Sequence, residues 1–450
     1  MERYDSYKDS GVKWLGEIPS HWEVVKLKSL CKMFGRIGFR GYSRDDLVDD
    51  GEGAITLSPS NFSDGHLDFS NSSYLSWSKY YESPEIMVQN GDIVFVKTAS
   101  IGKVAYVENL PVETTVNPQI LVFKEIKCNA KFLSYYLQST KIQGWIVASA
   151  NGSTISTISQ VSVGNYPVIL PAQKVQEALV EYIDIEISKI NVAIAQQQKM
   201  IDLLNERKQI IINNAVTKGL DPSVPLINSG IDWIGQIPEG WKVYKIKNLI
   251  SLQTDYDANG SFSDIAKNCN INTGNPYAWM VRTTDLVNKR FGIVEGNNYC
   301  DKSTYDYLAK SSLSPGDLLM TKRGNVGNVY LVPDYDRPMT LAPNLYLLRT
   351  LRNKVNNKFL MYFLSSSKPQ GQLALLNKST TLGALYKDDV KALNVVLPPL
   401  DVQNSLVDWI EDKIIDIERA IDCIKDMISL LQERKQIIIN DVVTGKVKIV

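Results

Sequence analysis

The chain has 450 residues, of which 44% are hydrophobic and 22% are charged, and it carries 49 basic and 49 acidic side chains. This length is too great for one ordinary domain, and this composition excludes a largely disordered chain, so at least two folded domains are expected. Because the formal net charge is +0, a nucleic-acid partner would have to be held by local basic surfaces.

The cysteines and the hydropathy pattern indicate the compartment. The five cysteines are scattered and never form a Cys-x-x-Cys pair, which argues against disulfides or a structural zinc. No window is long and apolar enough to span a bilayer, and the first residues lack the apolar core of a signal peptide. We therefore expect a cytoplasmic protein with no membrane role.

A Trp-rich segment near the start of the chain returns once. Gly11–Pro19 reads GVKWLGEIP, and Gly230–Pro238 reads GIDWIGQIP. Later, Glu206–Asn213 and Glu433–Asn440 both read ERKQIIIN. The two halves of the chain are therefore one unit, duplicated.

The two halves do not resemble each other evenly. Residues 23–90 and 242–315 barely align, whereas the Trp-rich segments and the C-terminal parts of the two halves agree closely. Such a pattern fits a shared scaffold with divergent functional surfaces, and it fits equally well the ordinary drift of loops in duplicated copies.

Short β-type runs follow a Gly-Asp pair in each half. The predicted strands are Ile93–Val96 and Val104–Val107, then Leu318–Thr321 and Val329–Val332. Glycine-bearing turns separate them, and short helices are expected at 131–140 and 358–366. Residues 1–170 and 221–397 are thus predicted to form two mixed, mainly β domains.

The turns between these strands carry cations and short polar side chains. The candidates for DNA contact are Lys97, Thr98, Ser100 and Lys103 in the first half and Lys322, Arg323, Asn325 and Asn328 in the second. Arginine and lysine suit guanine, and asparagine suits adenine. A solvated hairpin is an equally good interpretation of either turn alone. Further candidate phosphate contacts are Arg36, Arg40, Arg44, Arg349, Arg352, Lys354 and Lys358.

Two long helices are predicted at 171–220 and 398–450. Pro171 and the pair Pro398-Pro399 each precede about 45 residues without glycine or proline, which end near Gly219 and Gly445. Both segments repeat apolar residues at heptad spacing. The predicted seam consists of Ile183, Ile187, Ile190, Ile194, Ile201, Leu204, Ile410, Ile414, Ile417, Ile421, Ile428 and Leu431.

Each predicted helix has one narrow apolar face and therefore needs a partner helix. If the two helices pair antiparallel, their length of roughly 65 Å could act as a ruler, since one turn of DNA is roughly 34–36 Å long. An ordinary oligomerisation coiled coil is the alternative. Lys208 and Lys435 occupy matching seam positions, which suits either specification of register or an end at which another protein docks.

The side chains that chemistry would require are missing. The two histidines, His21 and His66, both lie in the first half, so no catalytic or metal cluster can be repeated between the halves. Neither a phosphate-binding loop nor GxGxxG occurs. We therefore expect a binding protein with no catalytic residue, no metal and no cofactor of its own.

Taken together, these motifs resemble the specificity subunit of Type I restriction-modification systems over nearly the whole chain. The resemblance rests on the Trp-rich segments, the Gly-Asp strands, Ser153-Thr154 and Ser379-Thr380, and Leu-Pro-x4-Gln before each long helix. It implies an α+β fold with a pseudo-two-fold internal repeat, in which two target-recognition domains are separated by an antiparallel coiled coil. Ser153, Thr154, Ser379 and Thr380 join the candidate DNA contacts on this ground.

The resemblance also implies function and partners. Each domain would read one half of a split site on double-stranded DNA, while the helices set the spacer. Two methyltransferase subunits that use S-adenosylmethionine would bind the chain, as would motor-nuclease subunits that use ATP and magnesium. The alternative is a coiled-coil scaffold that presents two protein-binding modules.

Overall fold

The computed structural model describes residues 2–36, 38–150, 156–271, 276–287, 298–324, 326–376 and 383–449. The chain forms two compact units. Unit 1 consists of Met1–Gln198 and Lys425–Val450, and unit 2 consists of Lys199–Ile424. Each unit therefore contains one β-rich domain and a part of both long helices. The predicted boundaries at residues 170, 220 and 397 stay predictions.

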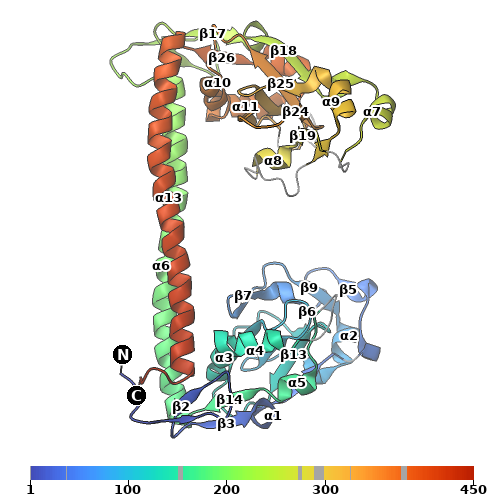
Figure 1. Cartoon of the computed structure of the whole chain (residues 1–450), viewed down its shortest axis with the longest axis vertical. Coiled ribbons are helices and arrows are strands. Elements are labelled where there is room, and N and C mark those ends of the chain that lie inside the picture. The colour runs from blue at the N-terminus through green and yellow to red at the C-terminus, as the bar shows by residue number, and fades with distance from the viewer. Residues whose placement is uncertain are drawn as a thin grey trace. The chain divides into compact units, whose positions relative to one another are not determined.

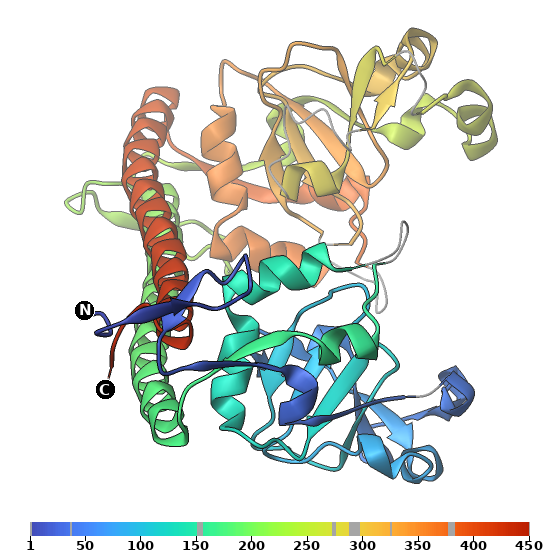
Figure 2. The same cartoon turned by 60° about the horizontal axis from the view of Figure 1, so that its bottom comes forward.

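The two long helices are α6 (Gln173–Lys218) and α13 (Leu400–Val443). They pack antiparallel and lie side by side in two different views (Figures 1 and 2), which confirms the predicted α+β fold with a helix pair. Gly219 (φ 73°) and Gly445 (φ 72°) follow their ends in the left-handed conformation that glycine adopts readily, and this conformation stops each helix.

The predicted seam residues are buried to different degrees. The buried ones are Ile183, Ile187, Ile190, Ile201, Ile410, Ile414, Ile417 and Ile421, and the half-buried ones are Ile194, Leu204, Ile428 and Leu431. At the polar seam positions, Lys208 pairs with Glu418 of the other helix at 2.6 Å. Lys435 is buried and contacts Asn191 of the other helix and Asp64 of the domain.

The domain of unit 1 contains two four-stranded sheets. The first has the order β11-β10-β13-β4, with β4 Lys32–Gly35, β10 Ile93–Val96, β11 Val104–Tyr106 and β13 Ile120–Lys124. The second has the order β12-β6-β9-β5, with β5 Leu47–Val48, β6 Gly53–Leu57, β9 Ser73–Ser76 and β12 Thr114–Val116. Three two-stranded sheets complete it: β1 Tyr7–Asp9 with β2 Glu17–Pro19, β3 Glu23–Lys26 with β14 Pro167–Leu170, and β7 Phe62–Ser63 with β8 His66–Leu67. Its helices are α1 Leu27–Leu30, α2 Trp77–Tyr81, α3 Ala130–Gln138, α4 Thr140–Ala148 and α5 Gln160–Gly164.

The domain of unit 2 repeats this plan. Its first sheet has the order β23-β22-β25-β18, with β18 Ile250–Asp255, β22 Leu318–Thr321, β23 Val329–Leu331 and β25 Leu345–Thr350. Its second has the order β20-β19-β24-β21, with β19 Ala278–Val281, β20 Tyr299–Cys300, β21 Ser312–Leu313 and β24 Met339–Leu341. Two-stranded sheets join β15 Leu226–Asn228 to β16 Gln236–Pro238 and β17 Lys242–Lys245 to β26 Asn394–Leu397. Its helices are α7 Phe262–Asn268, α8 Thr283–Val287, α9 Lys302–Tyr307, α10 Asn357–Leu364, α11 Ser367–Leu376 and α12 Lys387–Ala392.

The two domains share strand order where their sequences barely align. The first sheets are equivalent strand for strand, which confirms the four predicted strands, and α3 and α10 confirm the predicted short helices. The second sheets share a parallel pair, β12 with β6 and β24 with β19. Their fourth strands differ, because β5 extends one edge in unit 1 and β21 extends the opposite edge in unit 2.

A buried glutamine fastens each domain to the start of a long helix. Gln176 Nε2 donates to the backbone oxygen of Pro171 at 2.7 Å, while its Oε1 accepts from the backbone nitrogen of Asn129, which caps α3, at 2.8 Å. Gln403 makes the equivalent two bonds in unit 2, at 2.9 Å each. This is the physical reason for the repeated Leu-Pro-x4-Gln pattern.

The Trp-rich segment of each domain covers the end of a long helix. A Cβ atom placed on Gly445 would lie 3.1 Å from Trp22 Cζ3, and one placed on Gly219 would lie 3.5 Å from Trp241 Cζ2. Unit 1 therefore closes on the end of α13, and unit 2 closes on the end of α6. Each unit thus consists of the end of one long helix, a Trp-rich segment, a β-rich domain and the start of the other long helix. This order is the same in both units if residue 450 is regarded as joined to residue 1.

Candidate nucleic-acid interface

The turn of unit 1 between β10 and β11 is closed by backbone hydrogen bonds. Gly102 donates to the Val96 oxygen at 3.0 Å, and Val96 donates to the Lys103 oxygen at 2.9 Å. Ala99 (φ 65°) and Gly102 (φ 88°) reverse the chain in left-handed conformations. The turn is also fastened to the segment before α5, where Ile158 donates to the Lys97 oxygen at 2.9 Å.

Unit 2 builds its turn between β22 and β23 in the same way. Gly327 donates to the Thr321 oxygen at 2.9 Å, and Leu385 donates to the Lys322 oxygen at 3.0 Å. Each turn also forms one β-bridge with the segment that fastens it. These bridges join Thr98 to Thr157 in unit 1 and Arg323 to Ala384 in unit 2. The two turns therefore have one backbone construction and different side chains.

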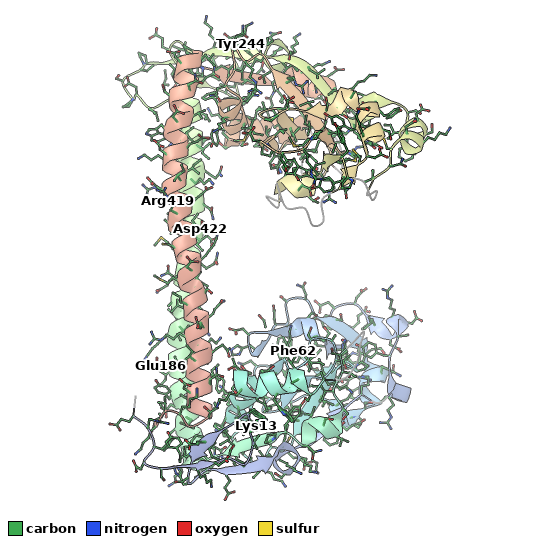
Figure 3. The ribbon with its side chains drawn as sticks, in the orientation of Figure 1. Lys13, Phe62, Glu186, Tyr244, Arg419 and Asp422 are labelled. Carbon is green, nitrogen blue, oxygen red and sulfur yellow. The ribbon has the colours of Figure 1, made fainter. Side chains whose placement is uncertain are left out.

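The candidate side chains on the turn of unit 1 have different surroundings. Ser100 is exposed, and Thr98 shares a 3.0 Å hydrogen bond with Thr157. Lys103 is exposed, and its Nζ donates to the backbone oxygens of Pro59 and Phe62, the latter labelled in Figure 3. Lys97 is half-buried.

The candidates in unit 2 differ from these at each position. Lys322 is buried and ion-paired with Asp255 and Asp257. Arg323 is exposed, and the backbone nitrogen of Asn328 donates to Thr321 Oγ1 at 3.0 Å. Five further candidates lie outside the described residues, namely Ser153, Thr154, Asn325, Ser379 and Thr380.

The repeated Gly-Asp pair has a structural role beside each turn. Asp92 accepts from the backbone nitrogen of Gln89 and pairs with Lys124 on the neighbouring strand, both at 2.9 Å. Asp317 does the same with the backbone nitrogen of Ser314 and with Arg349. The aspartate therefore caps the loop before each hairpin and fixes it to the sheet.

Several cations expected to contact phosphate are engaged within their own domains. Arg36 is buried and donates to the backbone oxygen of Val116 at 3.1 Å, and burial lowers the pKa of its guanidinium. The other engaged cations are Arg40 with Glu85, Arg349 with Asp317 and Lys358 with Glu411. The exposed cations of the two runs are Arg44, Arg352, Lys354 and Lys358, and Arg352 donates to the backbone oxygen of Pro315 at 3.2 Å.

Each long helix also carries an exposed apolar stripe away from the seam. Met200, Leu203 and Ile210 form it on α6 in unit 2. Met427, Leu430 and Ile437 form it on α13 in unit 1. Their spacings of three and seven residues place each set on one face of its helix. Figure 3 shows the side chains along the helix pair, with Arg419 and Asp422 marking α13 in unit 2.

Within the described residues, no group of three or more His, Cys, Asp or Glu side chains could hold a metal ion. The five cysteines are unbridged. In the same part of the chain, no helix has both the length and the apolar character needed to cross a membrane.

The fold and the paired turns define a class of protein built from two copies of one β-rich domain on a shared antiparallel helix pair. The family model of the Type I restriction modification DNA specificity domain matches this chain twice, at residues 19–201 and 238–422. The chain belongs to this family and is a DNA specificity subunit of a Type I restriction-modification system, the non-catalytic subunit of the Type I complex.

Relatives of known name cover nearly the whole chain. The MjaX Type I restriction enzyme specificity subunit of Methanocaldococcus jannaschii is 25% identical over 98% of both chains. The MjaVIII specificity subunit of the same organism is 21% identical over 98% of this chain and 97% of its own. A solved structure on complex assembly and conformational transition of the type I R-M system matches 96% of this chain and 99% of its own, with 15% identity and a TM-score of 0.63. This last similarity supports the fold.

Proposed function

We propose that each unit reads one half of a split DNA target and that the turns 97–103 and 323–328 enter the DNA groove. The single observation that carries this proposal is the pair of turns, which share their backbone hydrogen bonds and differ in their side chains. Unit 1 presents Thr98 and Ser100 where unit 2 presents Arg323 and Asn325. Arginine suits guanine and asparagine suits adenine, so the two half-sites differ in sequence.

We propose that the remaining candidates also contact DNA. Lys103 and Asn328 end the two turns, and Ser153, Thr154, Ser379 and Thr380 belong to the segments that lead to the bridging residues Thr157 and Ala384. Their hydroxyl groups suit phosphate oxygens or base edges.

The exposed stripes on the long helices support the proposal that two copies of one partner protein bind the chain. Met200, Leu203 and Ile210 recur as Met427, Leu430 and Ile437, so the same apolar face is offered once by each unit. A methyltransferase subunit with an apolar helical face is the occupant we propose for each stripe. Its S-adenosylmethionine, and the ATP and magnesium of the motor-nuclease subunits, belong to these partners. The complex works in the cytoplasm.

Methylation mapping tests the reading of a split target. The chain is expressed with its methyltransferase partner in cells without other adenine methylation, and modified adenines are mapped over the genome. We expect one motif of two dissimilar halves with a constant gap. Methylation without such a motif would refute the proposal.

Lengthening both helices by one heptad tests the spacer. Because Lys208 faces Glu418 and Asn191 faces Lys435, residues 195–201 and 425–431 lie opposite each other, and duplicating both keeps the seam in phase. The gap should widen by about three base pairs, since a heptad adds about 10 Å and a base pair about 3.4 Å. An unchanged gap would mean that the helices do not measure it. Duplicating residues 195–201 alone is the control and should abolish methylation, because the seam then loses its register.

A further inference from the structure

The two turns carry a lysine at the same position, yet the two lysines face different neighbours. In unit 1, Leu121 of β13 pairs with Gly35 on the edge strand β4. In unit 2, Tyr346 of the equivalent strand β25 pairs with Asp255 on the edge strand β18. Gly35 and Asp255 are therefore equivalent positions, and one lacks a side chain where the other carries a carboxylate.

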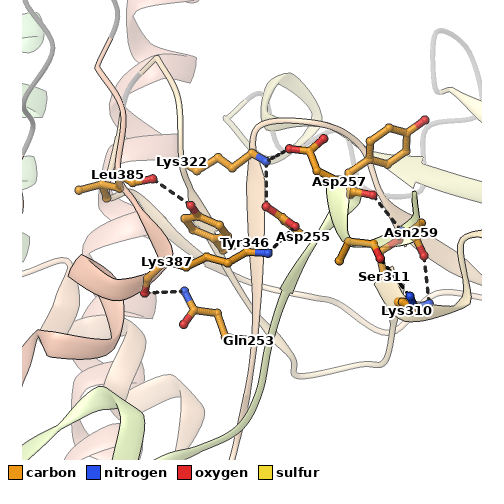
Figure 4. Close-up of polar contacts among 12 residues, drawn as sticks. Gln253, Asp255, Asp257, Asn259, Lys310, Ser311, Lys322, Tyr346, Leu385 and Lys387 are labelled. Carbon is orange, nitrogen blue, oxygen red and sulfur yellow. Dashed lines mark hydrogen bonds and ion pairs between the residues drawn. The ribbon is translucent and has the colours of Figure 1, made fainter. Parts of the chain in front are cut away.

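In unit 2 the turn lysine is neutralised by acidic residues. Lys322 Nζ lies 3.1 Å from Asp255 Oδ2 and 2.7 Å from Asp257 Oδ2, and it lies 5.7 Å from the centre of the Tyr346 ring. Lys387 reaches the other oxygen of Asp255 at 2.8 Å, as Figure 4 shows. Two lysines thus balance two aspartates, and the lysine of the turn is held inside the domain.

The pKa of Asp255 reflects this arrangement. Burial alone would raise it, but hydrogen bonds from Lys387 and Lys322 outweigh burial and hold the pKa below the usual value for aspartate. The carboxylate is therefore charged at neutral pH, and Lys322 keeps its counter-ion.

In unit 1 the turn lysine has no such counter-ion. Lys97 Nζ lies 3.8 Å from the place that a Cβ atom on Gly35 would occupy. No carboxylate forms an ion pair with Lys97 among the described residues of unit 1, and the undescribed ones, Met1, Ile37, residues 151–155 and Val450, carry no acidic side chain. Burial without a compensating charge lowers the pKa of Lys97. A half-buried cation of this kind gains from an external acceptor.

We infer that Lys97 donates a hydrogen bond to an acceptor of the DNA, a phosphate oxygen or the O6/N7 edge of guanine, whereas Lys322 stays an internal structural residue of unit 2. The inference rests on the proposed function and refines it. The equivalent lysines of the two turns have different roles, and the exposed Arg323 is the cation that the turn of unit 2 offers to DNA.

The test introduces a negative charge at position 35. Gly35→Asp places in unit 1 the carboxylate that unit 2 has at Asp255, and Gly35→Asn is a control of the same shape without the charge. Both side chains displace the end of the Leu121 side chain equally, because a Cβ atom at this position lies 2.8 Å from Leu121 Cδ2. Lys97→Gln and Lys322→Gln complete the set.

The full chain with its methyltransferase partner is titrated with a duplex that carries the mapped split target and with a duplex of equal length that lacks it. We expect Gly35→Asp and Lys97→Gln to weaken target binding roughly tenfold, and Gly35→Asn to stay within about twofold of the parent. Hydrogen exchange of the β13 amides verifies that each variant is folded. Equal binding by folded Lys97→Gln and the parent would overturn the inference.

Salt dependence separates the two acceptors. If Lys97 contacts a phosphate, Lys97→Gln weakens binding to both duplexes alike and reduces the slope of log K against log salt by about 0.9. If it contacts guanine, the loss is confined to the target duplex. Both results support the inference.

Lys322→Gln is the decisive comparison between the units. We expect faster hydrogen exchange in β18 and β25. Under conditions in which unit 2 is fully folded, the affinity for the target duplex should stay within about twofold of the parent. A tenfold loss in a folded Lys322→Gln variant would overturn the inference. If the parent itself yields no split motif, the proposed function fails, and this outcome is distinct because it appears before any substitution is made.

Discussion

At the scale of single residues, Asp255 is the side chain on which the internal charge balance of unit 2 depends. It is buried, and each of its two oxygens is bound by a different lysine, Lys322 and Lys387. Removing one partner from a buried ion pair leaves the other charge without compensation in a poorly solvated place. Asp255 should therefore contribute far more to stability than the exposed acids of the same domain.

We expect Asp255→Asn to lower the free energy of unfolding of unit 2 by about 3 kcal/mol at pH 7. The pKa of Asp255 is lowered in the folded protein, so its contribution is fully present above the unfolded value of about 3.9 and is lost as the pH falls through the folded value. The difference between the variant and the parent should therefore shrink below about pH 4. Urea unfolding at pH 7 and at pH 3.5, followed by hydrogen exchange of the β18 amides, measures it.

Asp388→Asn is the matched control, because the Asp388 side chain is almost fully exposed and its contact with Lys391 is long, at 3.8 Å. It should change stability by less than about 0.5 kcal/mol. A pH-independent effect of Asp255→Asn would contradict the assignment of its contribution to the charge.

The sequence could not distinguish Lys97 from Lys322. Both follow a predicted strand, both precede a glycine turn, and both were therefore predicted to contact DNA. The acids that hold Lys322 come from residues 242–315, which do not align with unit 1, and their pairing with the turn depends on a strand order that spans distant parts of the chain. The sequence offered one signal for these partners of Lys322, namely the two aspartates, Asp255 and Asp257, on either side of Tyr256.

At the scale of elements, the β7–β8 hairpin gives unit 1 a contact that the described part of unit 2 lacks. Asp64 at its tip forms an ion pair with the buried Lys435 of α13. A cavity of about 470 Å³ adjoins this pair, and the charges in its lining are satisfied, since Lys131 pairs with Glu108 and Asp184. The hairpin therefore ties the domain to the helix pair across this cavity.

Two substitutions on this contact should differ in their effect on stability. Asp64→Asn leaves the Lys435 charge buried with an amide partner, so we expect the free energy of unfolding of unit 1 to fall by about 1–3 kcal/mol. Lys435→Met removes the charge and places an apolar side chain of similar size in the seam, which should leave stability unchanged or raise it. Thermal unfolding of the full chain gives the sign of each effect.

Hydrogen exchange at the hairpin supplies a second measurement for the same pair of variants. Both should accelerate exchange in β7 and β8, because both release the hairpin from α13. Lys208→Met is the control, since Lys208 forms its ion pair with Glu418 of the helix pair, and it should leave β7 and β8 unchanged. Equal loss of stability in Asp64→Asn and Lys435→Met would contradict this account.

The long helices were predictable element by element, whereas the short strands were only partly so. Heptad spacing over more than forty residues is a strong and local signal, and α6 and α13 begin and end within a few residues of the expected places. The strands β10, β11, β22 and β23 were recognised because they are continuous apolar runs. Two-residue strands such as β5 and β21 depend on tertiary pairing, so no pattern in the sequence indicates them.

At the scale of the whole molecule, the duplication could be recognised from the sequence. The sequence did not indicate that residues from both ends of the chain belong to one unit, which we call the cyclic construction. The predicted division followed the chain from one end to the other. Unit 1 combines Met1–Gln198 with Lys425–Val450, because the end of α13 is covered by the Trp-rich segment near Trp22; this grouping does not test the predicted boundaries. Only spatial contacts such as that of Gly445 with Trp22 reveal this.

A circular permutant tests the cyclic construction. Lys448 donates a backbone hydrogen bond to Glu2 at 2.9 Å, so a short flexible linker can join these residues, and the exposed loop between Gly219 and Leu226 can be opened instead. We expect the permutant to fold and to direct methylation to the same split motif as the parent. Methylation mapping checks the motif, and circular dichroism checks the helix content.

Opening the chain between Glu206 and Arg207 is the control. This cut lies within α6, where it interrupts the seam beside Lys208, so we expect loss of cooperative unfolding and of methylation. Equal behaviour of the two permutants would argue against the cyclic construction.

The contact of Glu2 with Lys448 has a consequence for how the order of the two domains is understood. Because these two residues are hydrogen-bonded to each other within unit 1, the break in the chain falls inside a folded unit, and neither domain is first in any physical sense. The order in which the gene encodes the two domains would then not affect the DNA target that we propose, and reversing this order would leave the target unchanged. Moving the break to another exposed loop during evolution would therefore leave unchanged the DNA target that we propose.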